Sequence, residues 1–359
     1  MPNSELMPIG VFAQRSGLTS SALRFYADSG LLPPAEVDPV SGYRHYGADQ
    51  VARATALRRL REIAMPLAEV GTVLDAEAGE AARLVDEHVA GVVGDAAAAR
   101  QKAAVIKSVL GGDRPGLLIA ALKGPVLADA VDHVLTATAT AYGPGTAVLT
   151  GVHVEAGHEA ITLAATDRFR LSTRSLVPAR TAEQTWVGTI DGDDLRAAVT
   201  EIRHSALVRI EAVPHGIRLR MDEREDRHCR LLSEEFPDHR LMLASLGEVT
   251  TRATVAKDLL LRALEEHPGE CIALHISGHG VDVRSPNDEH PGIPLVATVT
   301  GEALQIRFET TTLYPAVSTA IGPDVMLDLR GHDRPVTIRS ADRGDLTTLA
   351  MPVRAEYSS

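Results

Sequence analysis

Arginine and aromatic side chains gather near the N-terminus of a chain that is only 3% aromatic. Residues 18–46, LTSSALRFYADSGLLPPAEVDPVSGYRHY, contain Arg24, Phe25, Tyr26, Tyr43, Arg44 and Tyr46. Aromatic residues of a protein core usually lack arginine neighbours, whereas arginine and tyrosine beside serine and glycine suit a surface that contacts phosphates and sugar edges. These residue types therefore indicate a nucleic-acid interface in this segment.

Another group of side chains has the spacing of metal ligands. The polar positions at intervals of four residues are His267, Cys271, His275 and His279. Imidazole and thiolate ligands suit Zn²⁺, but apolar residues at 272, 274 and 276 alternate with this set, and a half-buried strand explains that alternation. We favour the strand and expect neither a metal ion nor a cofactor.

The rest of the sequence shows no pattern of catalytic residues. Cys229 and Cys271 are too few for a disulfide framework or a zinc cluster. The acidic stretch at 222–226 and the DHR at 238–240 suit a solvated loop and a linker better than acid–base chemistry. We therefore expect a protein that is not an enzyme.

Length and charge limit the possible partners. A chain of 359 residues, 45% of them apolar, can form two or three domains. The net charge of −12 argues against nucleic-acid binding by the whole chain, but residues 1–75 are nearly neutral, with seven Arg against eight Asp and Glu. Residues 1–10 lack the pattern of a signal peptide, and no apolar stretch approaches the ~20 residues of a membrane span. We expect a cytoplasmic, nucleoid-associated protein without membrane contact.

Two helices separated by a tight turn must position the first group of side chains. In IGVFAQRSGLTSSALRFYADSGLLPP, residues 9–34, Gly17 interrupts the apolar pattern and the final SGLLPP stops the second helix. Thr19 or Ser20 can cap this second helix, which leaves Ser21 and Arg24 on its exposed side. A turn and a short β-ribbon then carry the tyrosine and arginine of SGYRHY, and two more helices are predicted within residues 49–75.

These segments, together with SGYRHY and ALRRLREIAMPLAEVGTVL, resemble the winged helix-turn-helix of the MerR transcription regulators over residues 7–76. A plain three-helix core is the alternative. The resemblance implies that the second helix reads the major groove of DNA and that the wing contacts the DNA backbone. The residues implied are Ser20, Ser21, Arg24, Tyr26, Tyr43 and Arg44. Many relatives have a basic residue at position 21 and an acidic one at 27, where this chain has Ser and Ala, so their base preference does not transfer.

A long helix with a narrow apolar seam is predicted over residues 80–110. The seam consists of Val85, Val89, Val92, Ala96, Ala99, Ala103, Ile106 and Leu110. Steps of four and three residues alternate along it, as in a two-stranded coiled coil. MerR regulators dimerise through an antiparallel coiled coil at this point, so the resemblance implies a homodimer on a pseudo-palindromic operator in double-stranded DNA. The alternative is a helix that packs on its own C-terminal region.

The C-terminal two-thirds of the chain contains a repeat. LRAAVTEI and LYPAVSTAI begin at residues 195 and 313, and the strand patterns LVRIEAV and VMLDLRG begin at 207 and 325, with the same offset. Each copy combines amphipathic helices with alternating strands. This pattern predicts an α+β fold in two modules, 117–243 and 248–357, each a helix-backed antiparallel sheet.

Three motifs in this region resemble the β sliding clamp of bacterial DNA polymerase III. They are AATDRFRL at 164–171, EEFPDHRLML at 234–243 and LAMPVR at 349–354. The resemblance covers residues 117–357 and implies the fold of the clamp's second and third domains. In clamps these motifs frame a hydrophobic groove that binds short peptides of polymerases and repair proteins.

The groove residues implied by this resemblance are Thr166, Arg168, Phe169, Arg170, Leu171, Thr312, Met351, Pro352, Val353 and Arg354. Phe169 stands where clamps usually have a polar residue, Thr312 lies near an expected aromatic, and Ala244 replaces a proline. We therefore expect a groove that is retained but reshaped. We expect Arg170 and Arg354 to lie at its rim and to favour a ligand with an acceptor or carboxylate.

Clamps line their central hole with basic helices, whereas the corresponding helices here are acidic. Their acidic residues are Asp129, Asp132, Asp191, Asp193, Asp194, Glu201, Asp258, Glu265 and Glu266. We expect that this fold does not encircle DNA. The leading hypothesis is a dimeric transcription regulator that acts on RNA polymerase at a promoter and responds to a small-molecule or peptide effector in the clamp-like groove. The alternative is an adaptor that tethers replication or repair proteins to a DNA locus through that groove.

Overall fold

The computed structural model describes residues 6–110, 116–139, 146–181, 184–286, 292–341 and 344–353, with side chains beyond residue 96 of the long helix described only at 98, 99, 102, 103 and 106. The chain divides into two compact units, residues 1–103 and 104–359. Among the described residues, no helix combines the length and the apolar character needed to cross a bilayer.

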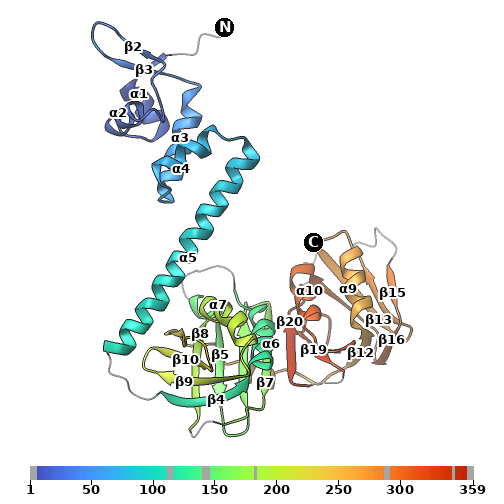
Figure 1. The fold of residues 1–359 in the computed structure, drawn as a ribbon. Coiled ribbons are helices and arrows are strands. Elements are labelled where there is room, and N and C mark those ends of the chain that lie inside the picture. Colours follow the sequence, from blue (N-terminus) through green and yellow to red (C-terminus); the bar gives the residue numbers. More distant parts are fainter. Residues whose placement is uncertain are drawn as a thin grey trace. The chain divides into compact units, whose positions relative to one another are not determined.

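Residues 6–110 form five helices and a small sheet, and the last helix continues past the boundary of the first unit (Figure 1). The helices are α1 (Ile9–Ser16), α2 (Ser20–Asp28), α3 (Gln50–Glu62), α4 (Leu67–Asp75) and α5 (Ala78–Leu110). The strands are β1 (Leu6–Pro8), β2 (Glu36–Val37) and β3 (Arg44–Gly47), in the order β1-β3-β2. The predicted two-stranded ribbon is therefore a three-stranded sheet, because β1 pairs with the free edge of β3.

Local sequence explains the ends of the first two helices. Gly17 ends α1 in the left-handed region, with a φ of 71°, which glycine adopts without steric cost. Thr19 is the cap of α2, since its Oγ1 accepts a hydrogen bond of 3.1 Å from the N–H of Ala22.

An aromatic pair holds the core of the first unit together. Phe12 of α1 and Tyr46 of β3 are both fully buried and stack with ring centroids 4.6 Å apart. The Tyr46 hydroxyl donates a hydrogen bond of 3.3 Å to the Leu23 carbonyl on α2. Tyr46 is thus a core residue that fixes the wing against both helices, not an interface residue.

The second unit contains two modules with separate apolar cores. The first module has the helices α6 (Gly124–Leu135) and α7 (Gly192–Arg203), the 3₁₀ turn η1 (Ala147–Thr150) and the strands β4 (Leu117–Lys123), β5 (Gly151–Ala156), β6 (Ile161–Thr166), β7 (Arg170–Leu176), β8 (Trp186–Asp191), β9 (Leu207–Val213), β10 (Gly216–Met221) and β11 (Arg227–Leu232). A linker with the short helix α8 (His239–Ala244) follows.

The second module has the helices α9 (Lys257–Glu266) and α10 (Thr310–Ser318) and the strands β12 (Thr251–Ala256), β13 (Cys271–Ser277), β14 (Gly280–Arg284), β15 (Ile293–Leu295), β16 (Ala297–Gly301), β17 (Leu304–Glu309), β18 (Asp324–Leu329), β19 (Val336–Ser340) and β20 (Leu346–Ala350). The repeated segments of the sequence occupy corresponding places, because α7 and α10 each precede a strand pair, β9–β10 and β18–β19. The fold of this unit is α+β, as predicted.

One antiparallel sheet runs through both modules. Among the described residues its order is β16-β12-β18-β19-β20-β7-β6-β5-β8-β11-β10-β9-β4, and β15-β14-β13-β17 form a separate sheet. The modules meet where β7 pairs with β20, with Leu171 opposite Leu349 and Arg170 opposite Ala350. This pairing brings the predicted groove motifs of the two modules to one place (Figure 1).

Candidate functional site

The N-terminal end of α2 presents polar side chains to solvent. Ser21 and Arg24 are exposed and Ser20, the first helical residue, is half-buried. Within residues 6–110, the Arg24 guanidinium has neither a hydrogen bond nor an ion pair with a described side chain. The start of α2 therefore combines an exposed cation with the first N–H groups of a helix, those that precede the Ala22 N–H capped by Thr19, which suits contact with a phosphate.

Tyr43 and Arg44 lie side by side on the wing but differ in their contacts. The Tyr43 side chain is 66% exposed. The Arg44 guanidinium donates hydrogen bonds of 2.7 Å to Asp28 Oδ1 and 3.1 Å to the Arg24 carbonyl. Arg44 thus ties the wing to α2, while Tyr43 is free to contact another molecule.

Apolar side chains are also exposed on this surface, and the sequence did not identify them as site residues. Phe25 of α2 is 53% exposed and packs edge-to-face on the half-buried Tyr26, at 5.6 Å between ring centroids. Val40, in the turn of the wing, is 96% exposed. Asp38 shapes this turn, because the N–H groups of Ser41 and Val40 each donate to its Oδ1 at 2.8 Å and hold the pKa of the carboxyl below its usual value. In the sequence, the signal that could have identified Val40 is an apolar residue close to an Asp that forms a turn.

A groove with a volume of about 560 Å³ lies in the second unit, where the two modules and the linker meet. The predicted residues that line it are Thr166, Arg168, Phe169, Arg170, Leu171 and Met351. Phe169 is 60% exposed, and its carbonyl accepts a hydrogen bond of 2.8 Å from the N–H of Met351. The two modules are therefore joined at the groove itself.

The turn between β6 and β7 holds Phe169 in place. Asp167 Oδ1 accepts hydrogen bonds from the N–H groups of Phe169 and Arg170, at 2.9 and 2.6 Å. Thr166 Oγ1 donates to the Arg170 carbonyl at 2.6 Å, and Arg168 adopts a φ of 79° at the tip. These bonds fix the turn from within, so Phe169 is presented by a rigid support.

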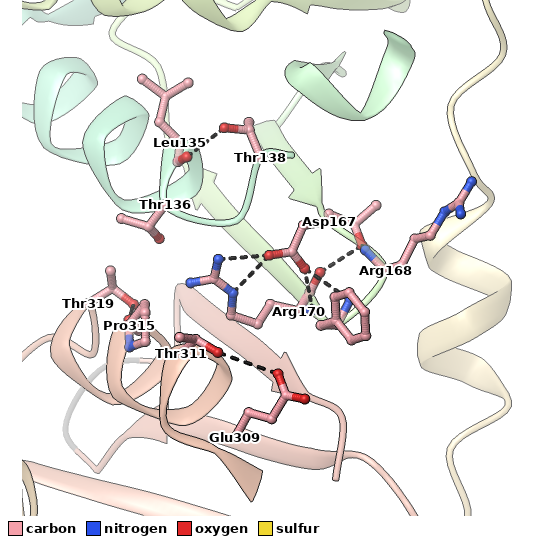
Figure 2. A network of polar contacts seen from close by, with 12 residues as sticks. Leu135, Thr136, Thr138, Asp167, Arg168, Arg170, Glu309, Thr311, Pro315 and Thr319 are labelled. Atoms are coloured by element: carbon pink, nitrogen blue, oxygen red, sulfur yellow. Dashed lines mark hydrogen bonds and ion pairs between the residues drawn. The ribbon is translucent and has the colours of Figure 1, made fainter. Parts of the chain in front are cut away.

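The charges of the groove are distributed differently from the prediction. Figure 2 shows Arg170 turned back onto Asp167, whose Oδ2 it contacts at 2.7 and 3.0 Å, while Arg168 points away from this pair. Arg330 donates to the Gly247 carbonyl at 2.9 Å, and burial lowers its pKa. Arg168 is exposed, and Arg334 is exposed with only a long contact of 4.0 Å to Asp333 Oδ1, so these two residues are the cations best placed to meet a ligand.

Three other predicted groove residues do not line the groove. Thr312 is buried inside the second module on α10. Pro352 and Val353 are half-buried, and the N–H of Val353 donates to the Arg307 carbonyl of β17 at 2.8 Å. Arg354 lies outside the described residues. The tail therefore contributes only Met351 to the described lining.

The linker, η1, the β18–β19 loop and β20 contribute lining residues that the sequence did not assign. They are Val148, Leu149, Glu235, Pro237, Met242, Ser245, Leu246, Gly247, Arg330, Arg334, Pro335 and Leu349. The linker motif at 234–243 was the signal for Glu235, Pro237 and Met242, and the other three linker residues follow it directly. Those on η1 and in the β18–β19 loop carry no motif, since only the folding of the sheet brings them to the groove.

Several acidic residues of the module helices cap a helix or pair with an arginine. Asp191 is 2% exposed, accepts the N–H groups of Asp193 and Asp194 as the cap of α7, and pairs with Arg230 at 2.7 Å. Asp194 is also buried and pairs with Arg230 at 3.0 Å. Arg203 bridges Asp129 and Asp132. The exposed helix surface is therefore less acidic than the sequence suggested.

Two segments of the chain match protein-family models. Residues 7–77 match the MerR HTH family regulatory protein, and residues 121–238 match the central domain of the DNA polymerase III beta subunit. Over 68 residues the chain is 41% identical to an HTH-type transcriptional regulator of Pseudomonas aeruginosa, and over 69 residues 39% identical to the HTH-type transcriptional regulator CueR of Yersinia pestis. Each match covers 19% of this chain and about half of the relative, 51% and 48%.

The second unit resembles solved structures of sliding clamps. The DnaN sliding clamp of Pseudomonas aeruginosa bound to griselimycin matches with a TM-score of 0.61 at 19% identity, over 67% of this chain and 66% of that chain. At this identity the likeness shows the fold alone. The chain thus begins with the helix-turn-helix domain of a MerR-type DNA-binding transcription regulator and continues with a region that has the fold of the DNA polymerase III β clamp.

Proposed function

We propose that the protein is a dimeric transcription regulator that binds a pseudo-palindromic operator through α2 and the wing and responds to an effector in the groove. The observation that carries this proposal is the surface formed by α2 and the wing. There the side chains of Arg24 and Tyr43 are exposed and have no partner within the described residues 6–110, while Arg44 fixes their relative placement. In this arrangement Ser20 and Ser21 read base edges, and Arg24 and Tyr43 contact phosphates. The protein acts in the cytoplasm, on the nucleoid.

The seam of α5 supports a dimer. Val89, Val92 and Ile106 are 43%, 48% and 56% exposed in the single chain. Val85 is half-buried against the core of the first unit, and the side chain of Leu110 lies outside the described residues. A second α5 would cover the exposed apolar residues, as in a coiled coil. Two helix-turn-helix domains would then bind two operator half-sites.

The groove supports a ligand with an apolar body and an acidic group. Phe169, Leu171 and Met351 supply apolar surface, and Arg168 and Arg334 supply charge, whereas Arg170 is already neutralised by Asp167. A small molecule or a short peptide fits this description. Occupancy of the groove alters how the protein acts on RNA polymerase at the promoter.

The same groove favours a second candidate function. A short peptide of a replication or repair protein could bind to the apolar lining, and the helix-turn-helix domain would tether that protein to a DNA locus. In this adaptor function, binding to the groove changes which proteins gather at the locus and leaves transcription unchanged.

A map of the protein's binding sites on its own genome, combined with transcript levels in a deletion strain, tests the proposed function. We expect sites with two half-sites in inverted orientation inside promoters, and altered transcripts of the adjoining genes. Sites without any change in adjoining transcripts would favour the adaptor. Uniform binding without recurrent half-sites would contradict both functions.

A further inference from the structure

Three side chains with metal-binding atoms meet on β5. His153 and Glu155 are two residues apart on this strand, so both lie on the face opposite Val152 and Val154, which are buried in the core of the first module. His239 begins α8 in the linker. One ligand atom from each of the three side chains lies within 4.8 Å of the other two.

A small apolar cluster brings the linker to this face. Phe236 is buried with Val148, Leu149 and Ala164. Its ring stacks on the His153 imidazole, with centroids 4.7 Å apart and an interplanar angle of 9°. His239 then follows three residues later and meets His153 edge-to-face at 5.7 Å. The packing of Phe236 and of His239 against the His153 ring therefore holds the linker beside β5.

The distances fit a tetrahedral ion with little rearrangement. Glu155 Oε1 lies 3.4 Å from His153 Nε2 and 4.0 Å from His239 Nε2. Ligand bonds of about 2.0–2.1 Å to a tetrahedral Zn²⁺ require about 3.3 Å between neighbouring ligand atoms. Shifts of less than about 1 Å would close the site around an ion, which is within the range of side-chain rotation.

Neighbouring groups orient the ligands in the way that metal sites require. His153 Nδ1 lies 3.1 Å from Oγ1 of Thr189, its cross-strand partner on β8. In the tautomer in which Nδ1–H donates to Thr189, Nε2 presents its lone pair toward Glu155. Arg240 donates to Glu155 Oε2, so that Oε1 is the oxygen turned toward the two imidazoles. His153 and Glu155, the two proposed ligands on β5, thus each have a hydrogen-bond partner that fixes the orientation of the side chain.

The site is also largely removed from solvent. The side chains of His153, Glu155 and His239 are 13%, 15% and 6% exposed. The three ligand side chains are therefore shielded from bulk water.

We propose that His153 Nε2, Glu155 Oε1 and His239 Nε2 bind a divalent first-row transition-metal ion, and that Zn²⁺ fits this donor set. Two nitrogens and one carboxylate oxygen disfavour Mg²⁺ and Ca²⁺, which prefer oxygen ligands. The ion would fasten the linker to β5. Because the same linker lines the groove through Pro237, Met242 and Leu246, metal binding would order one wall of that groove. This proposal departs from the expectation, based on the sequence, that the chain holds no metal.

Co²⁺ serves as the spectroscopic probe for Zn²⁺ in a first test. The full chain is purified without a histidine tag, freed of metal with a chelator and titrated with Co²⁺. We expect visible d–d absorption bands that saturate at one ion per chain, that Zn²⁺ removes and that Mg²⁺ leaves unchanged. Absence of these bands, or a thiolate-to-cobalt charge-transfer band, would overturn the proposal, because none of the proposed ligands is a thiol.

Variants identify the ligands in a second test. Loss of an outer partner of a metal ligand already costs about 10–100-fold in affinity, so His153→Gln and His239→Gln should each weaken Co²⁺ binding at least about 100-fold. His158→Gln, in the exposed turn after β5, is the matched control and should bind as the wild type does. Wild-type affinity in both ligand variants would refute the site. X-ray absorption of the zinc-loaded wild type needs no variant: two imidazoles are expected, and a spectrum without imidazole would refute it independently of folding.

Discussion

Tyr43 and Arg44 are neighbours in the sequence, yet only one of them can be changed without disturbing the wing. Arg44 holds the wing to α2 through Asp28 and the Arg24 carbonyl, so its loss would alter both structure and contact. Tyr43 is 66% exposed and carries no such tie. In the proposed DNA-contacting surface, Arg44 therefore provides the support and Tyr43 the contact.

Tyr43→Ala should weaken operator binding while the free energy of unfolding changes by less than about 0.5 kcal/mol, as is usual for exposed positions. Loss of one backbone contact costs about 1 kcal/mol, which is about fivefold in affinity. Gel shifts should show the same loss on operator and on unrelated DNA, because phosphate contacts carry no sequence information. Wild-type affinity in this variant would show that Tyr43 does not contact DNA. Val37→Ala, exposed on β2, is the control.

Phe169 is the residue whose change should report most directly on the groove. It is 60% exposed on a turn that Asp167 holds, so Phe169→Ala should fold normally. Burial of a Phe side chain contributes about 1.5–3 kcal/mol, so a short peptide that occupies the groove should bind about tenfold more weakly or worse. Operator affinity without ligand should not change. Val187→Ala, equally exposed on β8 outside the groove lining, is the matched control, and an equal effect of both variants would exclude this role for Phe169.

At the scale of elements, α5 would carry the assembly of the proposed dimer. Val92→Asp would place an unpaired charge in an apolar seam. Burial of an unpaired polar group costs about 2–7 kcal/mol, which would be lost from the free energy of dimerisation. We expect this variant to be monomeric at micromolar concentration in light scattering. Val93→Asp, the next residue and 63% exposed, lies outside the seam and should remain dimeric. A dimeric Val92→Asp variant would assign assembly to a surface other than this seam.

At the scale of elements, the pairing of β7 with β20 also determines the shape of the groove. It joins the two modules through a continuous ladder, from Arg174 opposite Leu346 to Arg170 opposite Ala350. Arg174 is buried and pairs with Asp345 at 2.8 Å beside this ladder. The groove is built across this junction, so its shape depends on both modules being folded.

At the scale of the whole molecule, the two compact units have separate apolar cores, whereas the two modules share one sheet. We therefore expect two thermal transitions in calorimetry. Operator DNA at about 100 times its Kd should stabilise the N-terminal unit by about 2.7 kcal/mol and raise the midpoint of that transition by about 10 °C or more. The transition of the clamp-like unit should stay in place. A single transition that DNA shifts as a whole would contradict the independence of the units.

The sequence by itself determined the features that depend on neighbouring residues. Gly17 and Thr19 end and begin helices through their own backbone geometry and hydroxyl, and the seam of α5 follows from its period. The repeat and the three clamp motifs could also be identified from the sequence, because each is a short pattern that does not depend on which distant residues it contacts. These signals were sufficient to predict the helix-turn-helix, the long helix and the α+β modules.

Only the tertiary structure decided which distant residues meet. It turned Arg170 onto Asp167, buried Asp191 against Arg230, and brought Arg334 to the groove from the β18–β19 loop. It also carried His239 of the linker to His153 on β5. Residues far apart in the chain come together through strand pairing and the packing of buried side chains, and no periodic pattern records which ones will do so. The partners of a charge and the lining of a groove therefore came from the fold.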